Sequence, residues 1–295
     1  MKPRDMGILI VDKPTGPTSH AVVNAVRRGT EIRKVGHAGT LDPRASGVLV
    51  LCLGAATRLS EYLSSGSKRY EALVRFGKST DTFDADGTVT SETGRVPALA
   101  EVQTLISSFT GTFRQVPPAY SAIKLKGKKA YELARAGETP ELEARTVTIY
   151  AIDIVRFEPP DLVLSVECSA GTYIRSLAND MGVEAGTGAL LAGLRRTQAG
   201  PFTLEDAVAF STLEAGFGSG AWREHLLSAR DALPEFPLVE LSDAEVELVK
   251  NGRRVPASST PQGLARGVGP DGEMVAILEA VEAENQWHPS KVLVS

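Results

Sequence analysis

The residue best suited to chemistry is Asp42, which lies in the loop sequence Gly36–Pro43 (GHAGTLDP). Glycines in this loop let the backbone turn tightly and approach a ligand, and Pro43 biases Asp42 away from helical conformation. The apolar run Gly47–Leu53 follows the loop, so a rigid strand would present one carboxylate to a substrate. The alternative is structural, because an aspartate in such a loop also forms Asx turns and helix caps.

Other motif-like stretches lack an essential residue. The sequence Gly77–Thr80 (GKST) imitates the end of a P-loop, but Ala72 stands where that motif needs its first glycine. Asp84–Gly87 (DADG) imitates the centre of a calcium loop, but Thr82 and Thr93 stand where the first and last acidic ligands belong. The four histidines have no HExxH spacing, and the two cysteines form no CxxC pair. We therefore expect no metal and no cofactor.

Charge is unevenly distributed along the chain. The net charge of −4 argues mildly against a polyanionic partner. Yet Tyr120–Arg135 carries five bases and one acid, whereas Glu205–Val249 carries ten acids and two bases. One surface could meet phosphates while another carries the acids; alternatively, both runs are ordinary solvated faces.

Composition and length indicate an ordinary two-domain globular protein. Hydrophobic residues make up 42% of the chain and charged residues 23%. At 295 residues the chain is too long for one ordinary core. The start MKPRD is polar and carries no apolar signal-peptide region, and the longest apolar run, Gly47–Ala56, is too short to span a bilayer. We expect a cytoplasmic protein without a membrane partner.

Hydrophobic periodicity predicts the elements that must position these residues. Thr18 or Ser19 is expected to cap the first helix. Gly137 is expected to end the helix predicted over residues 129–136. Short apolar runs between turns in the last sixty or so residues favour a small β-barrel after a boundary near residue 235. The patterns predict strands over residues 7–11, 47–53, 70–76, 146–157 and 162–168, and helices over 18–28, 56–63, 99–109, 129–136 and 172–181.

Six stretches carry a resemblance to a known family. The sequence GHAGTLDPRASGVL closely resembles the catalytic motif of the TruB family of tRNA pseudouridine synthases. Ser46 and Arg44 are small departures from it. Five further stretches resemble other motifs of the family, in the same order over about residues 7–205: ILIVDKPTGPTSH, KRYEALVRFGKSTDTFDADG, PPAYSAIKLKGKKAYELARAG, SAGTYIRSLANDMG and GALLAGLRRTQAGPF.

The resemblance implies an isomerase (EC 5.4.99.25) that converts uridine to pseudouridine at position 55 in the T loop of tRNA. It implies that Asp42 acts at the ribose C1′, either by nucleophilic attack or by way of a glycal intermediate. Arg175 would pair with Asp42 and keep it ionised in a desolvated site, because burial alone raises a carboxyl pKa. Tyr70 would stack on the extruded uracil and assist late proton removal.

The same resemblance assigns further contacts. Tyr173 and Leu194 would line the base pocket, although Leu194 also fits a core position. His37 would contact the opened T loop, and Lys13 would support the structure or charge near the active site. Tentative RNA-backbone contacts are Arg58, Lys68, Arg69, Lys124, Lys126, Lys128 and Lys129.

The C-terminal stretches LSDAEVELVKNGRRVP, MVAILEA and WHPSKVL more loosely resemble parts of a PUA-type RNA-binding domain. The implied fold is α+β, the pseudouridine synthase fold, with a large mixed, mostly antiparallel sheet and a small C-terminal PUA-like β-barrel. The implied domains are a catalytic domain over residues 1–234, with an RNA-gripping insertion at about 117–145, and a PUA-like domain over 235–295. We expect a monomer that needs tRNA but no protein partner; the alternatives are a guide-RNA-dependent synthase and a non-catalytic tRNA-binding or folding protein.

Overall fold

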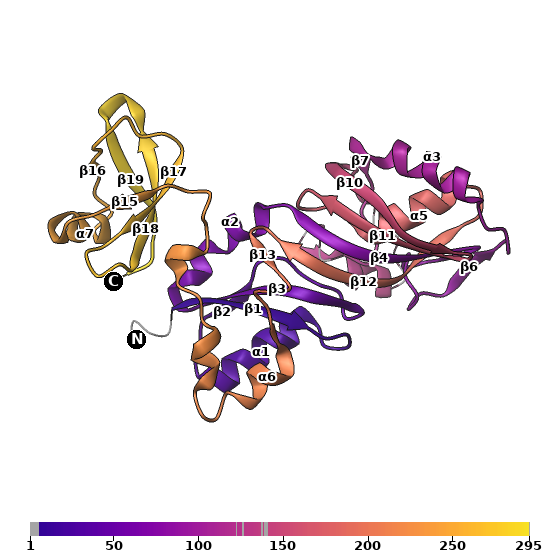
Figure 1. The fold of residues 1–295 in the computed structure, drawn as a ribbon, viewed down its shortest axis with the longest axis horizontal. Helices are drawn as coiled ribbons and strands as arrows, with labels where there is room; N and C mark the ends of the chain where they lie inside the picture. The colour runs from indigo at the N-terminus through magenta and orange to yellow at the C-terminus, as the bar shows by residue number, and fades with distance from the viewer. Residues whose placement is uncertain (1–5, 122, 126, 137, 139–140, 295) are drawn as a thin grey trace. The chain divides into compact units, whose positions relative to one another are not determined.

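The computed structural model describes residues 6–294 except residues 122, 126, 137, 139 and 140. Its contacts divide the chain into two compact units, whose elements are traced in Figure 1. The first unit comprises Met1–Pro43, Gly47–Gly66 and Ala199–Ser295, and the second comprises Arg44–Ser46 and Ser67–Gln198. The domain boundary near residue 235 stays a prediction.

The first unit is built around two buried strands. β1 (Gly7–Lys13) pairs antiparallel with β3 (Ala45–Leu53) along its whole length. β3 also pairs antiparallel with β2 (Val35–His37), and β14 (Val208–Ala209) pairs parallel with β1. Almost every residue of β1 and β3 is buried, as predicted for runs that are apolar on both faces.

Helix α1 (Ser19–Thr30) packs beside this sheet and contacts β2 and α6. Of the two candidate caps, Thr18 is the one used: its Oγ1 accepts from the Ala21 N–H at 2.9 Å. The remaining short elements of this part are β13 (Phe202–Thr203), η2 (Gly54–Leu59), α2 (Ser60–Ser65), α6 (Phe210–Ala215), η3 (Ala221–His225) and η4 (Ala229–Asp231).

The predicted helix over residues 56–63 differs in detail, because its first part is the 3-10 helix η2 and only α2 is α-helical. The Thr57 hydroxyl donates to the Gly54 carbonyl at 2.8 Å, and the Ser60 hydroxyl donates to the Thr57 carbonyl at 2.9 Å. These local bonds satisfy carbonyls that a continuous α-helix would use, and they suit the tighter winding.

The second unit contains the strand order β12–β4–β11–β10–β7, and the pairings from β4 to β7 are antiparallel. Helices α3 and α5 contact each other and pack against its strands, with apolar side chains between. The main elements are β4 (Lys68–Phe76), α3 (Leu99–Phe109), β7 (Gly111–Gln115), β10 (Arg145–Glu158), β11 (Asp161–Cys168), α5 (Ile174–Glu184) and β12 (Ala189–Ala199). Two hairpins add β5 (Lys78–Thr80) with β6 (Val89–Glu92), and β8 (Lys124–Leu125) with β9 (Lys128–Lys129), which leads into α4 (Ala130–Arg135).

The C-terminal residues of the first unit form a five-stranded, curled half-barrel sheet, which agrees with the predicted small β-structure. Its order is β15–β17–β18–β19–β16, and buried residues such as Ile277 and Leu278 contribute to its cores. Ser242 begins α7 with a capping box to Glu245. The elements are β15 (Leu238–Glu240), α7 (Asp243–Lys250), β16 (Val255–Pro256), β17 (Leu264–Val268), β18 (Met274–Val281), η5 (Glu282–Glu284) and β19 (Gln286–Val292). Together the units confirm an α+β fold with a large mixed, mostly antiparallel sheet.

Candidate active site

The loop that carries Asp42 is held by hydrogen bonds on both sides of that residue. The Ser19 hydroxyl donates to the Leu41 carbonyl at 2.9 Å, and the Leu41 N–H donates to the same hydroxyl at 2.8 Å. On the other side, the Gly16 N–H donates to the Pro43 carbonyl at 2.8 Å. Because the backbones of Leu41 and Pro43 are both held, the position of the half-buried Asp42 between them is restricted.

Lys13 contributes to the same support. Its side chain is fully buried at the end of β1, and its ammonium donates to the carbonyls of Pro14 at 2.8 Å, Pro17 at 2.9 Å and Pro43 at 3.4 Å. A buried ammonium is tolerated where it is hydrogen-bonded in this way. The expectation that Lys13 supports the local structure matches this geometry, whereas a contact with substrate stays a prediction.

The other predicted residues of the first unit are His37 and Arg58. His37 is half-buried at the end of β2, opposite Leu51 of β3, and Asp42 lies in the loop that follows. Arg58 is exposed on η2, and its guanidinium donates to the Val292 carbonyl. Their contacts with RNA stay predictions.

In the second unit, Arg175 is a buried cation on the first turn of α5, with 8% of its side chain exposed. Its Nη2 donates to the Tyr120 carbonyl at 2.9 Å, and its Nη1 donates to the Thr82 carbonyl at 3.2 Å. Nη1 also lies 3.5 Å from Oδ2 of Asp84. These contacts hold the guanidinium in one place; its predicted pairing with Asp42 stays a prediction.

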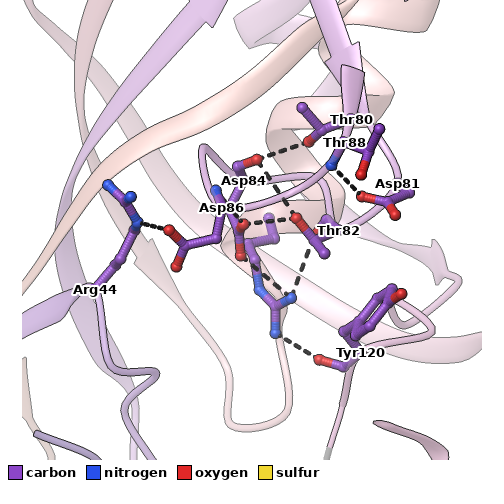
Figure 2. A network of polar contacts seen from close by, with 9 residues as sticks. Arg44, Thr80, Asp81, Thr82, Asp84, Asp86, Thr88 and Tyr120 are labelled. Atoms are coloured by element: carbon purple, nitrogen blue, oxygen red, sulfur yellow. Dashed lines mark hydrogen bonds and ion pairs between the residues drawn. The ribbon is translucent and has the colours of Figure 1, made fainter. Parts of the chain in front are cut away.

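Asp84 is a contact of Arg175 that the motif search missed. Its Oδ1 accepts from the Thr82 hydroxyl at 2.6 Å and from the Asp86 N–H at 3.0 Å (Figure 2). Backbone hydrogen bonds between Leu191 of β12 and residues 83 and 85 pin the loop to the sheet. The signal in the sequence is three aspartates within residues 81–86 that have no calcium frame, because neighbouring carboxylates repel one another and favour a nearby cation.

The start of α5 is positioned by a buried glutamine of β7. Gln115 is 2% exposed; its Oε1 accepts from the Tyr173 N–H at 2.8 Å, and its Nε2 donates to the Tyr173 carbonyl at 3.1 Å. The Ser176 hydroxyl donates to the Val116 carbonyl at 2.8 Å. Tyr173 and Ser176 lie on either side of Arg175 in the sequence. Because both are held by these hydrogen bonds, the backbone of Arg175 is also held.

Tyr70 and Leu194 pack against one apolar cluster of the second unit. Tyr70 lies on β4 opposite Val166, Leu194 lies on β12, and both are partly buried. Their shared cluster makes them suitable as an apolar wall for a base, although it gives equal support to an ordinary core position for Leu194. The second unit thus contains four of the residues predicted for catalysis or the base pocket: Tyr70, Tyr173, Arg175 and Leu194.

The predicted RNA-backbone residues do not all lie at the surface. Lys68 is only 6% exposed, and burial together with nearby Arg196 lowers its pKa to about 8. A phosphate cannot readily reach this ammonium, so the tentative assignment of Lys68 is corrected. Its neighbour Arg69 is exposed and pairs with Glu167 across the strands at 2.5 Å.

The lysine-rich insertion is described only in part. The backbone of Lys124 pairs with that of Lys129, and Leu125 pairs with Lys128, which gives a β-hairpin. Lys126 and the expected cap Gly137 lie outside the described residues. Phosphate contacts by the lysines of this hairpin stay predictions.

Metal and thiol chemistry find little support in the described chain. Among the residues described, no group of three or more His, Cys, Asp or Glu side chains could hold a metal ion. Burial raises the pKa of Cys52 to about 12 and that of Cys168 to about 11, so both thiols stay protonated at neutral pH. No helix within the described ranges has the length and apolar character needed to cross a membrane.

Comparison with family profiles gives matches along most of the chain. Residues 27–174 match the TruB family pseudouridylate synthase N-terminal domain. Residues 175–233 match a tRNA pseudouridylate synthase B C-terminal domain, and residues 236–294 match the C-terminal domain of tRNA pseudouridine synthase II.

Individual relatives agree with these profiles. The chain is 42% identical to tRNA pseudouridine synthase B of Pseudomonas fluorescens (strain Pf0-1), covering 94% of this chain and 92% of the relative. It is 44% identical to the protein of that name from Thermobifida fusca (strain YX), with 95% and 96% covered. Among solved structures, a chain from a crystal structure of a Cbf5-Nop10-Gar1 complex superposes with a TM-score of 0.75 at 29% identity, covering 99% of this chain and 86% of that one.

Proposed function

We propose that this chain, which belongs to the TruB family of pseudouridylate synthases, isomerises uridine to pseudouridine at position 55 in the T loop of tRNA. Uridine isomerisation in tRNA follows from the family and its named relatives; the position and the residue roles are our proposal. The observation that supports the roles is the clamp on the carbonyls of Leu41 and Pro43, the two residues beside Asp42. Such a clamp is what a reaction needs when one carboxylate must meet one carbon atom.

The reaction exchanges one glycosidic bond for another. The C1′–N1 bond breaks, the freed uracil turns, and a C1′–C5 bond forms; C5 then loses its proton and N1 gains one. No electrons are gained or lost overall, so the isomerisation consumes no redox equivalent and no energy carrier. Asp42 acts on the ribose at C1′, and both nucleophilic attack and a glycal route satisfy this balance.

Arg175 and its neighbours serve the charged part of the site. A guanidinium held by two carbonyls and Asp84 has little freedom to move, so it can offer a fixed positive charge to the Asp42 carboxylate. Asp84 is then a positioning residue, because it acts through Arg175.

The aromatic residues serve the base. A uridine inside a stacked loop is inaccessible, so the enzyme must extrude it and replace its stacking partners. Tyr70 would stack on the uracil and assist proton removal from C5, while Tyr173 and Leu194 would line the pocket. His37 would contact the opened loop.

We further propose that the chain works alone in the cytoplasm as a monomer, without a guide RNA or protein partner. The support is a difference in sequence identity. The chain is 41–44% identical to relatives named tRNA pseudouridine synthase B, but only 29% identical to the chain from the Cbf5-Nop10-Gar1 complex. The exposed Arg69 and the lysine hairpin would contact the phosphates of the T arm.

The test is release of tritium from C5-labelled uridine in an unmodified T-arm stem-loop. The purified chain, with chelator and without nucleotide, guide RNA or other protein, should release one tritium per target uridine. A stem-loop whose target uridine is replaced by cytidine, labelled elsewhere at C5, is the matched control and should release none. Activity that requires an added RNA or protein would favour the guide-dependent alternative, and binding without release would favour the non-catalytic one.

A further inference from the structure

The first unit contains a cleft of about 760 Å³ that the proposed active site does not use. It lies between the turn after α1, the 3-10 helix η2, the residue Arg223 and the last described residues of the chain. Glu31 is the one acid among the described residues that line it. The four basic residues of this basic cleft are Arg33, Lys34, Arg58 and Arg223.

This gathering of positive charge is unexpected from the composition. The chain as a whole has a net charge of −4, and Arg223 comes from the acidic segment Glu205–Val249. Like charges that converge on a cleft repel one another and destabilise the fold slightly. The arrangement becomes favourable when an anion enters the cleft, which points to a binding role.

Two of the four cations are held in place by the fold. The Arg58 guanidinium donates to the Val292 carbonyl. The Cζ atom of Arg223 lies 4.4 Å from the ring centroid of Trp222, which is 1% exposed. Arg33 and Lys34 are exposed, and neither has an ion-pair partner in the described part of the chain, so both can meet a ligand.

The basic cleft lies within reach of the catalytic loop through β2. Lys34 directly precedes β2, and its carbonyl accepts from the Gly54 N–H at 2.8 Å; His37 ends β2 and Asp42 follows in the next loop. Three strand residues span about 10 Å at roughly 3.3 Å each. Along the axis of a nucleic-acid duplex, each strand carries a phosphate about every 3.4 Å, so a duplex arm lying along β2 would place about three phosphates of one strand within this distance.

We propose that the basic cleft binds the sugar-phosphate backbone of the tRNA substrate a few nucleotides from the target uridine. This inference rests on the proposed function, because it takes the RNA bound at Asp42 as the source of the phosphates. Arg33 and Lys34 are the principal contacts, and Arg58 and Arg223 add to the field. The cleft contributes affinity and orientation, and no chemical step passes through it.

The test compares Arg33→Gln/Lys34→Gln with Arg95→Gln/Arg156→Gln, which removes two exposed positive charges of the second unit. Circular dichroism first establishes that both double variants are folded. For the cleft variant, the Kd for full-length tRNA should rise about tenfold at 0.1 M salt, and the slope of log Kd against log salt should fall by about 1.5. KM should rise with Kd while kcat at saturating tRNA stays unchanged, and the control should behave as the wild type.

Several outcomes would overturn the proposal. A cleft variant whose tRNA affinity and salt slope match those of the control excludes backbone contact, and a loss in kcat alone would place these residues in the chemistry. Tripolyphosphate titration distinguishes a small-anion site: lost tripolyphosphate binding with unchanged tRNA affinity means that free phosphates are the ligand. Because Kd is measured without turnover, a wild type that binds tRNA but releases no tritium would refute the proposed function and still leave the cleft open to this test.

Discussion

The substitution Asp84→Asn separates a positioning role from a merely structural one. It keeps the size and most hydrogen bonds of the side chain but removes the charge that faces Arg175 at 3.5 Å. Only 8% of the Arg175 side chain and 18% of the Asp84 side chain are exposed. At an effective dielectric constant of about 20, two charges at that distance attract by about 5 kcal/mol.

The net loss should be smaller than this attraction. Arg175 keeps its bonds to the Tyr120 and Thr82 carbonyls, and the asparagine oxygen can still accept a hydrogen bond. We expect the free energy of unfolding to fall by about 2–3 kcal/mol, near the lower end for a buried pair that loses one partner. We also expect kcat to fall about a hundredfold, as for a displacement of about 1 Å in a positioned group, with the Kd for tRNA unchanged.

Two neighbours provide matched controls for the same chemical change. Asp81 accepts from the Thr88 N–H and faces no arginine in the described structure, and Asp86 pairs with the exposed Arg44. Asp81→Asn and Asp86→Asn should each change stability by less than about 1 kcal/mol and leave kcat near that of the wild type. Urea unfolding and single-turnover tritium release measure both quantities; if Asp84→Asn behaves like these controls, Arg175 is not positioned by Asp84.

Three further predictions concern other parts of the site. Gln115→Leu should lower the free energy of unfolding by about 1–2 kcal/mol in urea, because the half-buried Tyr173 N–H loses its Gln115 acceptor, whereas the Tyr173 carbonyl keeps its bond from the Leu177 N–H; an unchanged midpoint would contradict this. Lys13→Met should lower kcat by about ten- to a hundredfold in the tritium assay with KM little changed, because the Pro43 carbonyl beside Asp42 loses a donor; wild-type kcat would show that the clamp is dispensable. The pKa of Lys68 is about 8 in the folded protein, against an ordinary 10.5. Between these values the unfolded chain binds more protons than the folded protein. The destabilisation caused by burying the charged ammonium is therefore relieved as pH rises from about 8 to 10.5. Lys68→Met should therefore stabilise the protein more at pH 7.5 than at pH 10, as read from paired urea titrations, and an equal gain at both would refute the lowered pKa.

Local patterns predicted many elements well. The helix Leu99–Phe109 has the predicted bounds, and the buried strand predicted over residues 47–53 extends only two residues further at its start. These elements were accessible because periodicity and apolar runs act over a few residues. The order of the strands could not be predicted from local patterns, because pairings such as β1 with β3 join segments that are distant in sequence. Only the resemblance predicted the architecture.

The site shows where residue patterns were misread. Lys68 and Arg69 were assigned together to the RNA backbone, but neighbouring residues of a strand point to opposite faces. In β4, Lys68 is buried and Arg69 is exposed, as that alternation requires. Asp84 was considered only as a calcium ligand, and its partner Arg175 lies so far away in sequence that no local spacing could connect them.

The most direct test of the central claim is tritium release by Asp42→Asn, with wild-type binding of the T-arm stem-loop measured in parallel. The substitution preserves the shape of the loop, in which Ser19 and Gly16 hold the carbonyls of Leu41 and Pro43, and replaces only one carboxylate oxygen by an amide nitrogen. We predict that release falls to background while the stem-loop Kd changes less than about threefold. Turnover by Asp42→Asn at an appreciable fraction of the wild-type rate would mean that another group performs the chemistry at C1′.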